Sequence, residues 1–459
     1  MSNTPPPHDD SDTGKGRSTG LNRYEGAALL LGVLVAHLFF IRNAPLPLAY
    51  DDYDYAMAGR SIWENGLFSK FYGSEIRTYG YPLFLSLVHG TGLPLKWIVF
   101  EVQLLLYLLS AALVRAELCK RSEALGRVLF CAIAVNFYAL LYTTEILTES
   151  LSVTALLVAA ASWLRIQPEP ARLAPLCIGS AAAAAAVMIR PANLFLLGSW
   201  IIGCLIIFGP LFLKRRAPVT AFSRMALVVL IVSAIFLPQW VNNVRNWQRP
   251  TPLTAHDLQL TQQQLGVENL KYATALPPAP QPEVFYKNPL AEGTAIDPLA
   301  PLKWYVEYPV RGGLTLALHI FNMTDQDLLF TYAHDLHPWF RIPHGLLNHA
   351  IVALGLLGFV LWWRGIAQKR ARTDLEAATV LTVLALSTCA IYATTVVEMR
   401  FGLTLLSILF PCAAYALMRL HTVDVRLKLA ASGAVAVYVA GALILSAWVR
   451  NQAPQIAAA

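Results

Sequence analysis

The sequence predicts an all-α polytopic membrane protein. Of its 459 residues, 56% are hydrophobic and only 14% are charged, and the mean hydropathy is +0.51. A water-soluble domain of this composition would aggregate, whereas apolar runs near the ~20 residues needed to cross a bilayer account for it. We therefore expect a bundle of about 11 transmembrane helices.

Basic residues set the expected topology. The polar residues 1–22 offer little to bury and predict a disordered cytoplasmic tail before the transmembrane domain at 23–449. Lys and Arg then occur in every second connection, which places the N-terminus inside and the tail at 450–459 outside. The expected spans are 25–41, 95–115, 128–144, 149–165, 173–189, 192–213, 225–242, 346–363, 377–397, 401–418 and 429–448.

Two long segments fall on the expected outer side. The first outer loop, 42–94, contains an apolar stretch at 81–90 that is too short to span a membrane and suits an interfacial or re-entrant piece. The large outer loop, 243–345, combines a Pro-rich part with stretches rich in Trp and Tyr. These aromatics fit a membrane-surface belt better than stacking on sugar rings. No internal repeat is evident.

Charge and cysteine usage exclude several classes of function. The net charge of +7 comes from the loops assigned to the cytoplasm, so it predicts orientation and not a nucleic-acid partner. The six cysteines lie mostly in apolar runs without ligand spacing, so neither a disulfide framework nor a zinc site is expected. His334 and His337 stand three apart, but no acidic or cysteine partner accompanies them at ligand spacing.

The most informative polar feature is the run Asp51-Asp52-Tyr53-Asp54-Tyr55, which follows the first apolar span after a short loop. Carboxylates beside a bilayer are costly, so this run is a functional-site hypothesis. Such an acid can serve as a general base. The alternative is a solvated loop start with no chemical role.

Other ionisable residues gather at the outer ends of the spans. Glu145 and Glu149 share a face if the chain stays helical there, although Glu149 is also a candidate helix cap. Arg190 is either a ligand or a snorkelling residue, and Glu398 either serves a site or pairs with Arg400. The residues expected to converge on one outward-facing cavity are Asp51, Arg77, Glu149, Arg190, Glu398 and Arg400.

Several short motifs follow one another on this outer side. They are DDYDYAMA at 51–58, RTYGYPLF at 77–84, LTESL at 147–151, RP at 190–191, PQW at 238–240 with RN at 245–246, and EMRF at 398–401. In this order they resemble the GT-C superfamily of polyprenyl-phosphate-sugar glycosyltransferases, especially protein O-mannosyltransferases and the lipid A aminoarabinose transferase. Phe401 stands where that family usually has Tyr, which removes a hydroxyl.

The resemblance implies roles for individual residues. Asp51 is the expected catalytic base, and Asp52 is the alternative that orients the acceptor or shares the proton. Some relatives use a divalent cation, and Asp51 or Asp52 would hold it here; the sequence does not decide whether one is bound. The residues implied to bind substrate are Tyr55, Arg77, Tyr81, Glu149, Arg190, Arg245, Glu398 and Arg400.

The expected function is that of an inverting glycosyltransferase in a bacterial cytoplasmic (inner) membrane. It would move a hexosyl or pentosyl group from a polyprenyl-phosphate donor to a hydroxyl of a cell-envelope lipid, glycan or protein on the periplasmic side. The reaction requires a base for the acceptor and cations for the departing phosphate. The alternatives are a lipid-linked-sugar flippase or transporter, and an undecaprenyl-diphosphate-glycan ligase or polymerase. A transporter predicts midplane charges and two related halves, which the sequence lacks.

Overall fold

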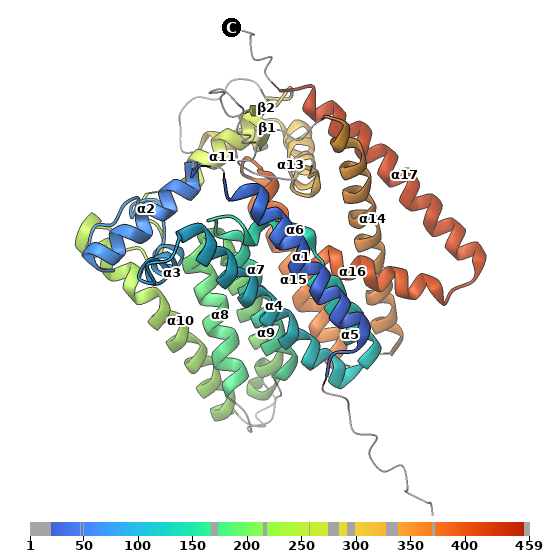
Figure 1. Cartoon of the computed structure of the whole chain (residues 1–459), viewed down its shortest axis with the longest axis horizontal. Helices are drawn as coiled ribbons and strands as arrows, with labels where there is room; N and C mark the ends of the chain where they lie inside the picture. The colour runs from blue at the N-terminus through green and yellow to red at the C-terminus, as the bar shows by residue number, and fades with distance from the viewer. Residues whose placement is uncertain are drawn as a thin grey trace, which may run out of the picture.

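In the computed structural model, the chain forms an α-helical bundle with one small β-ribbon (Figure 1). The structure describes residues 20–45, 47–48, 50–166, 173–213, 218–256, 258–273, 284–291, 299–326, 338–369 and 372–453. Most of the tail expected at 1–22, the Pro-rich stretch at 277–282, His334 and His337 lie outside these residues.

The predicted spans correspond to helices, and the chain is a multi-pass membrane protein. Within the described residues, seven helices are long and apolar enough to cross a bilayer, or eight if one bent pair is counted as a span. This count is below eleven because α7 and α8 have only 17 and 16 residues and the apolar part of α15 is short. The bundle helices are α1 (Arg23–Asn43), α4 (Leu95–Arg121), α5 (Glu123–Ala134), α6 (Phe137–Thr143), α7 (Glu149–Arg165), α8 (Ala174–Ile189), α9 (Leu194–Leu213), α10 (Pro218–Trp247), α14 (Pro338–Lys369), α15 (Arg372–Ala393), α16 (Leu403–His421) and α17 (Val425–Arg450).

The third predicted span, 128–144, is broken. Its two parts, α5 and α6, meet at 48° on either side of Val135 and Asn136. The Asn136 side chain accepts a hydrogen bond from a backbone amide of α6 and caps that helix, so the local sequence favours a new start. Residues 144–148 are not helical either. Glu145 and Glu149 therefore do not share a helical face, and only Glu149 belongs to α7.

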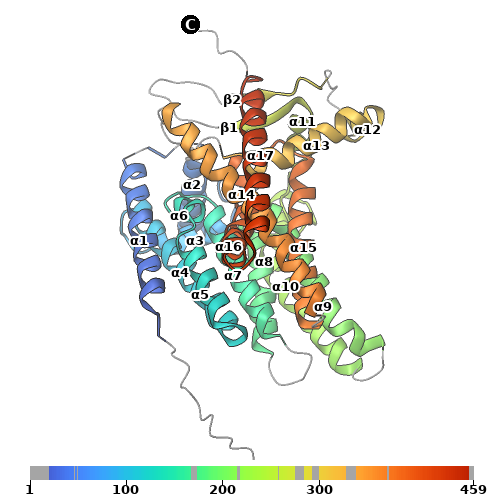
Figure 2. The same cartoon turned by 90° about the vertical axis from the view of Figure 1, so that its right-hand side faces the viewer.

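The remaining elements gather at one end of the bundle, together with the last residues of α17 (Figures 1 and 2). The apolar stretch predicted at 81–90 forms a short helix there and does not span the bundle. Two bundle helices extend into the segment predicted as the large outer loop, 243–345, since α10 continues to Trp247 and α14 starts at Pro338. The elements at this end are α2 (Tyr50–Asn65), α3 (Gly80–His89), α11 (Leu258–Glu268), β1 (Asn269–Ala273), β2 (Val284–Lys287), α12 (Ala300–Glu307) and α13 (Pro309–Thr324), with the short 3₁₀ helices η1 (Pro191–Asn193) and η2 (Met399–Gly402).

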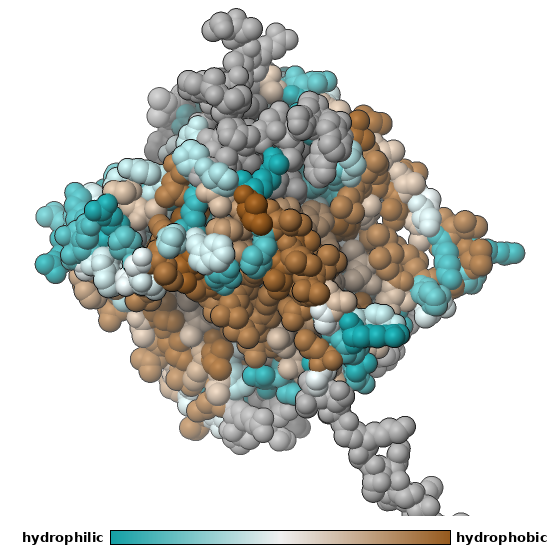
Figure 3. Space-filling view, viewed as in Figure 1, coloured by the Kyte–Doolittle hydropathy of each residue, from teal (hydrophilic) through white to brown (hydrophobic). Residues whose placement is uncertain are grey.

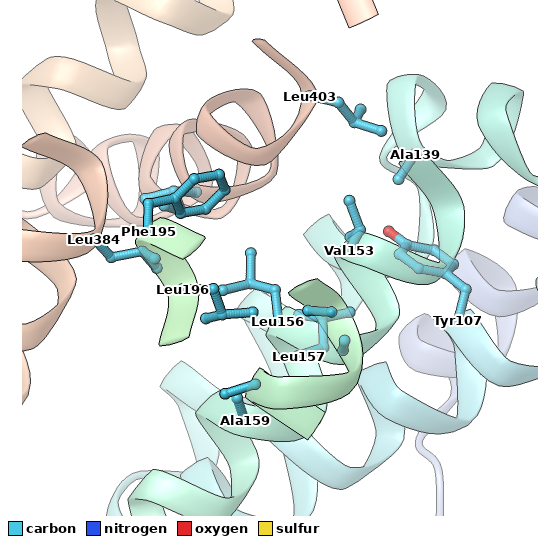
Figure 4. Packing of buried hydrophobic residues seen from close by; sticks show 14 of the residues in the cluster. Tyr107, Ala139, Val153, Leu156, Leu157, Ala159, Phe195, Leu196, Leu384 and Leu403 are labelled. Carbon is cyan, nitrogen blue, oxygen red and sulfur yellow. The ribbon is translucent and has the colours of Figure 1, made fainter. Parts of the chain in front are cut away.

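The apolar core lies where the central helices meet (Figure 4). Val153 and Leu156 of α7 face Phe195 and Leu196 of α9, and Leu384 of α15 closes the same cluster. Val153 and Leu156 stand three residues apart on α7, as a helix face that packs on a core requires. All five side chains are buried. Asn193, directly before α9, donates a hydrogen bond to Ser152 in the first turn of α7 at 2.8 Å, so the starts of the two helices lie close together.

The surface of the bundle is apolar, as the composition predicts. Leu38 of α1 and Val437 and Ile444 of α17 are 66%, 75% and 72% exposed. In a soluble protein such residues would be buried, whereas in a bilayer they face lipid. Figure 3 shows apolar side chains across the middle of one face and hydrophilic ones over α2.

Candidate active site

Helix α2 presents three polar side chains on one face. Asp51, Asp54 and Tyr55 are spaced i, i+3 and i+4, so they lie one above another. Asp52 is turned about a quarter of the helix away, is 4% exposed, and lies near Glu145. Burial, followed by the neighbouring Asp52 carboxylate, raises the pKa of Glu145 to about 8. The helix phase thus separates the two adjacent aspartates into different surroundings.

Arg77 binds the exposed face of α2. Its Nη2 lies 2.9 Å from Asp51 Oδ1 and 3.0 Å from Asp54 Oδ2, and its side chain is only 8% exposed. The guanidinium carbon stands 4.6 Å from the centre of the Tyr55 ring. Behind it, the buried Tyr81 ring meets Tyr55 edge to face at 5.1 Å. The two tyrosines form a support under Arg77.

Arg400, from η2, reaches Asp51 from the other side. Its Nη2 lies 2.6 Å from Asp51 Oδ2, and its Nε lies 2.6 Å from Glu398 Oε2 and 3.7 Å from Glu149 Oε1. Burial raises the pKa of Glu398 to about 7, although Arg400 opposes this shift. Arg400 thus makes the ion pair with Glu398 that the sequence offered as an alternative, and it also lies within ion-pair distance of Asp51 and Glu149.

Glu149 and Arg190 complete the cluster. Glu149 opens α7 and is 3% exposed, and its Oε1 makes an ion pair with Arg190 Nη1. Thr148 gives α7 no side-chain cap, so the Glu149 carboxylate is engaged mainly by arginine. The Arg190 guanidinium lies 4.5 Å from the centre of the Phe401 ring. Phe401, which lacks the hydroxyl of a Tyr, thus makes a cation–π contact with Arg190.

Together these residues form one chain of alternating charge that lines a cavity of about 940 Å³. Each of the carboxylates Asp51 and Glu149 lies between two guanidiniums. The order along the chain is Asp54, Arg77, Asp51, Arg400, Glu149 and Arg190. Such a row positions several cations at one opening while keeping each of them paired.

Four residues predicted for the site do not line this cavity. Glu398 lies behind Arg400, which it contacts through Oε2. Asp52 is buried on another face of α2, and Tyr81 lies behind Tyr55. Arg245 is exposed on α10 and is not among the described lining residues. Asp51 and Asp52 are adjacent in the sequence, so their different surroundings became apparent only from the rotation of α2. Arg245 lies in the last turn of α10, where its side chain is exposed.

Other lining residues had no individual role among the expectations. Asp54 belongs to the acidic run at 51–55 that forms the functional-site hypothesis, and in the structure it lines the cavity beside Asp51. Several polar lining residues come from the turn after α10 and from α11, which the large loop gave no reason to place here. They include Arg249, Thr251, His256, Gln259 and Gln262.

Two further features of the molecule are the possible metal ligands around Asp51 and the six cysteines of the bundle. No group of three or more His, Cys, Asp and Glu side chains in the described residues is arranged to hold a metal ion. Both oxygens of Asp51 accept from arginine. A divalent cation at Asp51 or Asp52 stays a prediction. All six cysteines are free, and they lie one each in α4, α5, α8, α9, α15 and α16.

The chain resembles one solved enzyme in its course. No protein-family model matches the chain, and no curated protein matches it. A solved structure with a similar course is an archaeal oligosaccharyltransferase AglB from Archaeoglobus fulgidus, in complex with an inhibitory peptide and a dolichol-phosphate. The alignment has 12% identity and a TM-score of 0.45, and covers 94% of this chain and 55% of the other. The chain thus spans about half the length of that protein.

Proposed function

We propose that the chain is an integral-membrane inverting glycosyltransferase that uses a polyprenyl-phosphate-linked sugar. The observation that carries the proposal is the alternating row of carboxylates and arginines in a cavity at the ends of the spans. A lipid-linked donor keeps its tail in the bilayer and its phosphate at the surface, where Arg190 and Arg400 lie beside the first turns of α9 and α16. Arg77, Arg190 and Arg400, the three arginines of the row, all belong to the motifs found in the sequence.

The proposed step is a displacement at sugar C1. The acceptor oxygen forms a bond to C1 as the bond from C1 to the phosphate oxygen breaks, and the electron pair leaves with the phosphate. Asp51 takes the acceptor proton, and attack opposite the leaving group inverts C1. The leaving phosphate gains charge, which guanidiniums stabilise without changing their protonation.

The ion pairs of Asp51 bear on when it acts as a base. Both its oxygens accept from arginine, at 2.9 Å from Arg77 and 2.6 Å from Arg400. A donor phosphate beside Arg400 would compete with Asp51 for the same guanidinium. Arg400 retains Glu398 as a partner during that exchange. The acceptor would thus meet an Asp51 carboxylate released by donor binding.

The two alternative functions predict different geometries. A transporter should carry its charges near the middle of broken spans, and its halves should be related. The charged cavity here lies at one end of the helices, which favours surface chemistry over passage. A ligase or polymerase acting on undecaprenyl-diphosphate glycans would use the same compartment and a similar cavity. It differs in its donor, which carries two phosphates.

The test uses the purified full-length protein. In detergent, it is given a panel of polyprenyl-monophosphate and polyprenyl-diphosphate sugars with an extract of envelope acceptors, and sugar transfer and anomeric configuration are measured. In liposomes, passage of the same lipids between leaflets is measured. Transfer from a monophosphate donor with inversion supports the proposal. Transfer only from diphosphates, or lipid passage without transfer, would overturn it in favour of the corresponding alternative.

A further inference from the structure

Arg249 differs from the other arginines that line the cavity. Arg77, Arg190 and Arg400 each pair with a carboxylate. Arg249 lines the same cavity with an exposed side chain, and no carboxylate in the described part of the chain lies within ion-pair distance of it. Its charge is therefore available to a ligand, while the other three are balanced by the protein.

The backbone before Arg249 adopts an unusual conformation. Gln248 has a φ of 54°, in the left-handed region that residues other than Gly, Asn and Asp rarely adopt. This residue ends α10 and turns the chain toward the cavity. Tyr50, with a φ of 53°, precedes Asp51 in the same way, and these are the two non-glycine residues with positive φ in the described chain. Outliers of this kind concentrate at functional sites.

Buried amides connect this turn to the rest of the site. The Asn243 side chain is fully buried and donates to the Thr251 carbonyl at 2.8 Å, while the Asn243 backbone carbonyl accepts from the Arg249 backbone amide at 3.2 Å. Gln239 donates to Asn243 at 3.0 Å and accepts from the Tyr79 amide at 2.8 Å. The turn is thus fixed to the segment that carries Arg77, so Arg249 is positioned relative to the inner row of charges.

The walls of the cavity differ in their chemistry. Glu149 opens α7 and Arg190 directly follows α8, so both lie at span ends, where a lipid-linked donor of the proposed reaction would enter from the bilayer. The wall formed after α10 and along α11 instead offers Arg249 together with neutral polar groups such as Gln259 and Gln262. Amide side chains suit the hydroxyls of a glycan, and one guanidinium among them suits an anion.

We propose that Arg249 binds an anionic group of the acceptor, so that the acceptor is a phosphate- or carboxylate-bearing glycan or glycolipid. This inference rests on the proposed glycosyl transfer. It leaves the three arginines of the charged row to the donor phosphate and assigns Arg249 to the second substrate. A guanidinium binds either anion through two parallel hydrogen bonds and stays charged at all working pH values.

The first test measures binding without turnover. Glucose 6-phosphate, glucuronate and glucose serve as probes, titrated into the full-length wild type, Arg249→Ala and Arg245→Ala in detergent by thermal shift. Arg245→Ala is the matched control, since this exposed arginine lies in the last turn of α10, four residues before Arg249, and is outside the cavity lining. We expect one charged sugar to bind more tightly than glucose to the wild type and the control, and about tenfold more weakly to Arg249→Ala. The probe that responds identifies the anion as phosphate or carboxylate.

The second test measures the same variants in transfer. We expect Arg249→Ala to raise the acceptor KM about tenfold with little change in kcat, and undecaprenyl phosphate to bind all three proteins alike. Acceptor extract stripped of phosphate, or amidated at its carboxylates, should lose the advantage of the wild type over Arg249→Ala. Equal probe binding by wild type and Arg249→Ala overturns the proposal, and so does a selective loss of undecaprenyl phosphate binding. Arg249-dependent probe binding without transfer from any donor would retain the anion site and overturn glycosyl transfer instead.

Discussion

Asp51→Asn separates the proposed catalytic role of Asp51 from its contribution to stability. The change keeps the shape of the side chain and one oxygen acceptor, but removes the charge that Arg77 and Arg400 share. Loss of a positioned base typically slows a reaction by about 10²–10⁴-fold. This corresponds to about 3–5 kcal/mol of transition-state stabilisation. We therefore expect sugar transfer to fall by at least about a hundredfold.

The same structure predicts a small effect on stability. The Asp51 side chain is 33% exposed, Arg77 retains Asp54, and Arg400 retains Glu398. Hydrogen bonds to charged groups contribute about 1.5–3 kcal/mol when buried, so with partners retained and water nearby the loss should be below about 2 kcal/mol. Thermal unfolding in detergent, followed alongside transfer, measures both quantities on one preparation.

Asp52→Asn is the matched control for this experiment. It makes the same chemical change at the adjacent residue, whose side chain is buried away from the cavity. We expect transfer to remain within about tenfold of the wild type. Transfer by Asp51→Asn at a comparable level, or loss of transfer only in Asp52→Asn, would refute the assignment of Asp51 as the base.

Three further variants test other parts of the molecule. A Cβ at Gly402 would lie 1.7 Å from the Met323 carbonyl oxygen, so Gly402→Ala should destabilise the protein by about 1–3 kcal/mol in thermal unfolding, whereas Gly433→Ala, with open space around it, should be nearly neutral. The pKa of Glu145 is near 4.5 in the unfolded chain and about 8 in the folded protein. Between these two values the folded state holds the proton more tightly, so stability falls as pH rises. Glu145→Gln should flatten this fall in unfolding midpoints measured from pH 4.5 to 8. Glu149→Ala leaves a mostly buried arginine without its closest partner and should cost about 3–5 kcal/mol, while an unchanged midpoint would contradict the buried ion pair.

Much of the fold was predictable because it depends on local properties of the chain. Crossing a bilayer requires a run of apolar residues, and such runs identified the bundle helices from α1 to α17. Charged residues among those runs are costly unless they find partners, which marked Asp51, Glu149, Arg190 and Arg400 as a group. The break between α5 and α6 was missed, since a continuous apolar run does not show where one helix caps another.

The pairing within the site required the tertiary structure. Asp51 and Arg400 are 349 positions apart, and no local pattern relates them. The phase of α2 separated Asp51 from Asp52, and a left-handed residue at the end of α10 brought Arg249 to the cavity in place of Arg245. Hydropathy and charge are sums over short windows, so they establish which end of the bundle holds the polar residues. Which carboxylate meets which guanidinium depends on helix rotation and chain reversal, and only packing decides those.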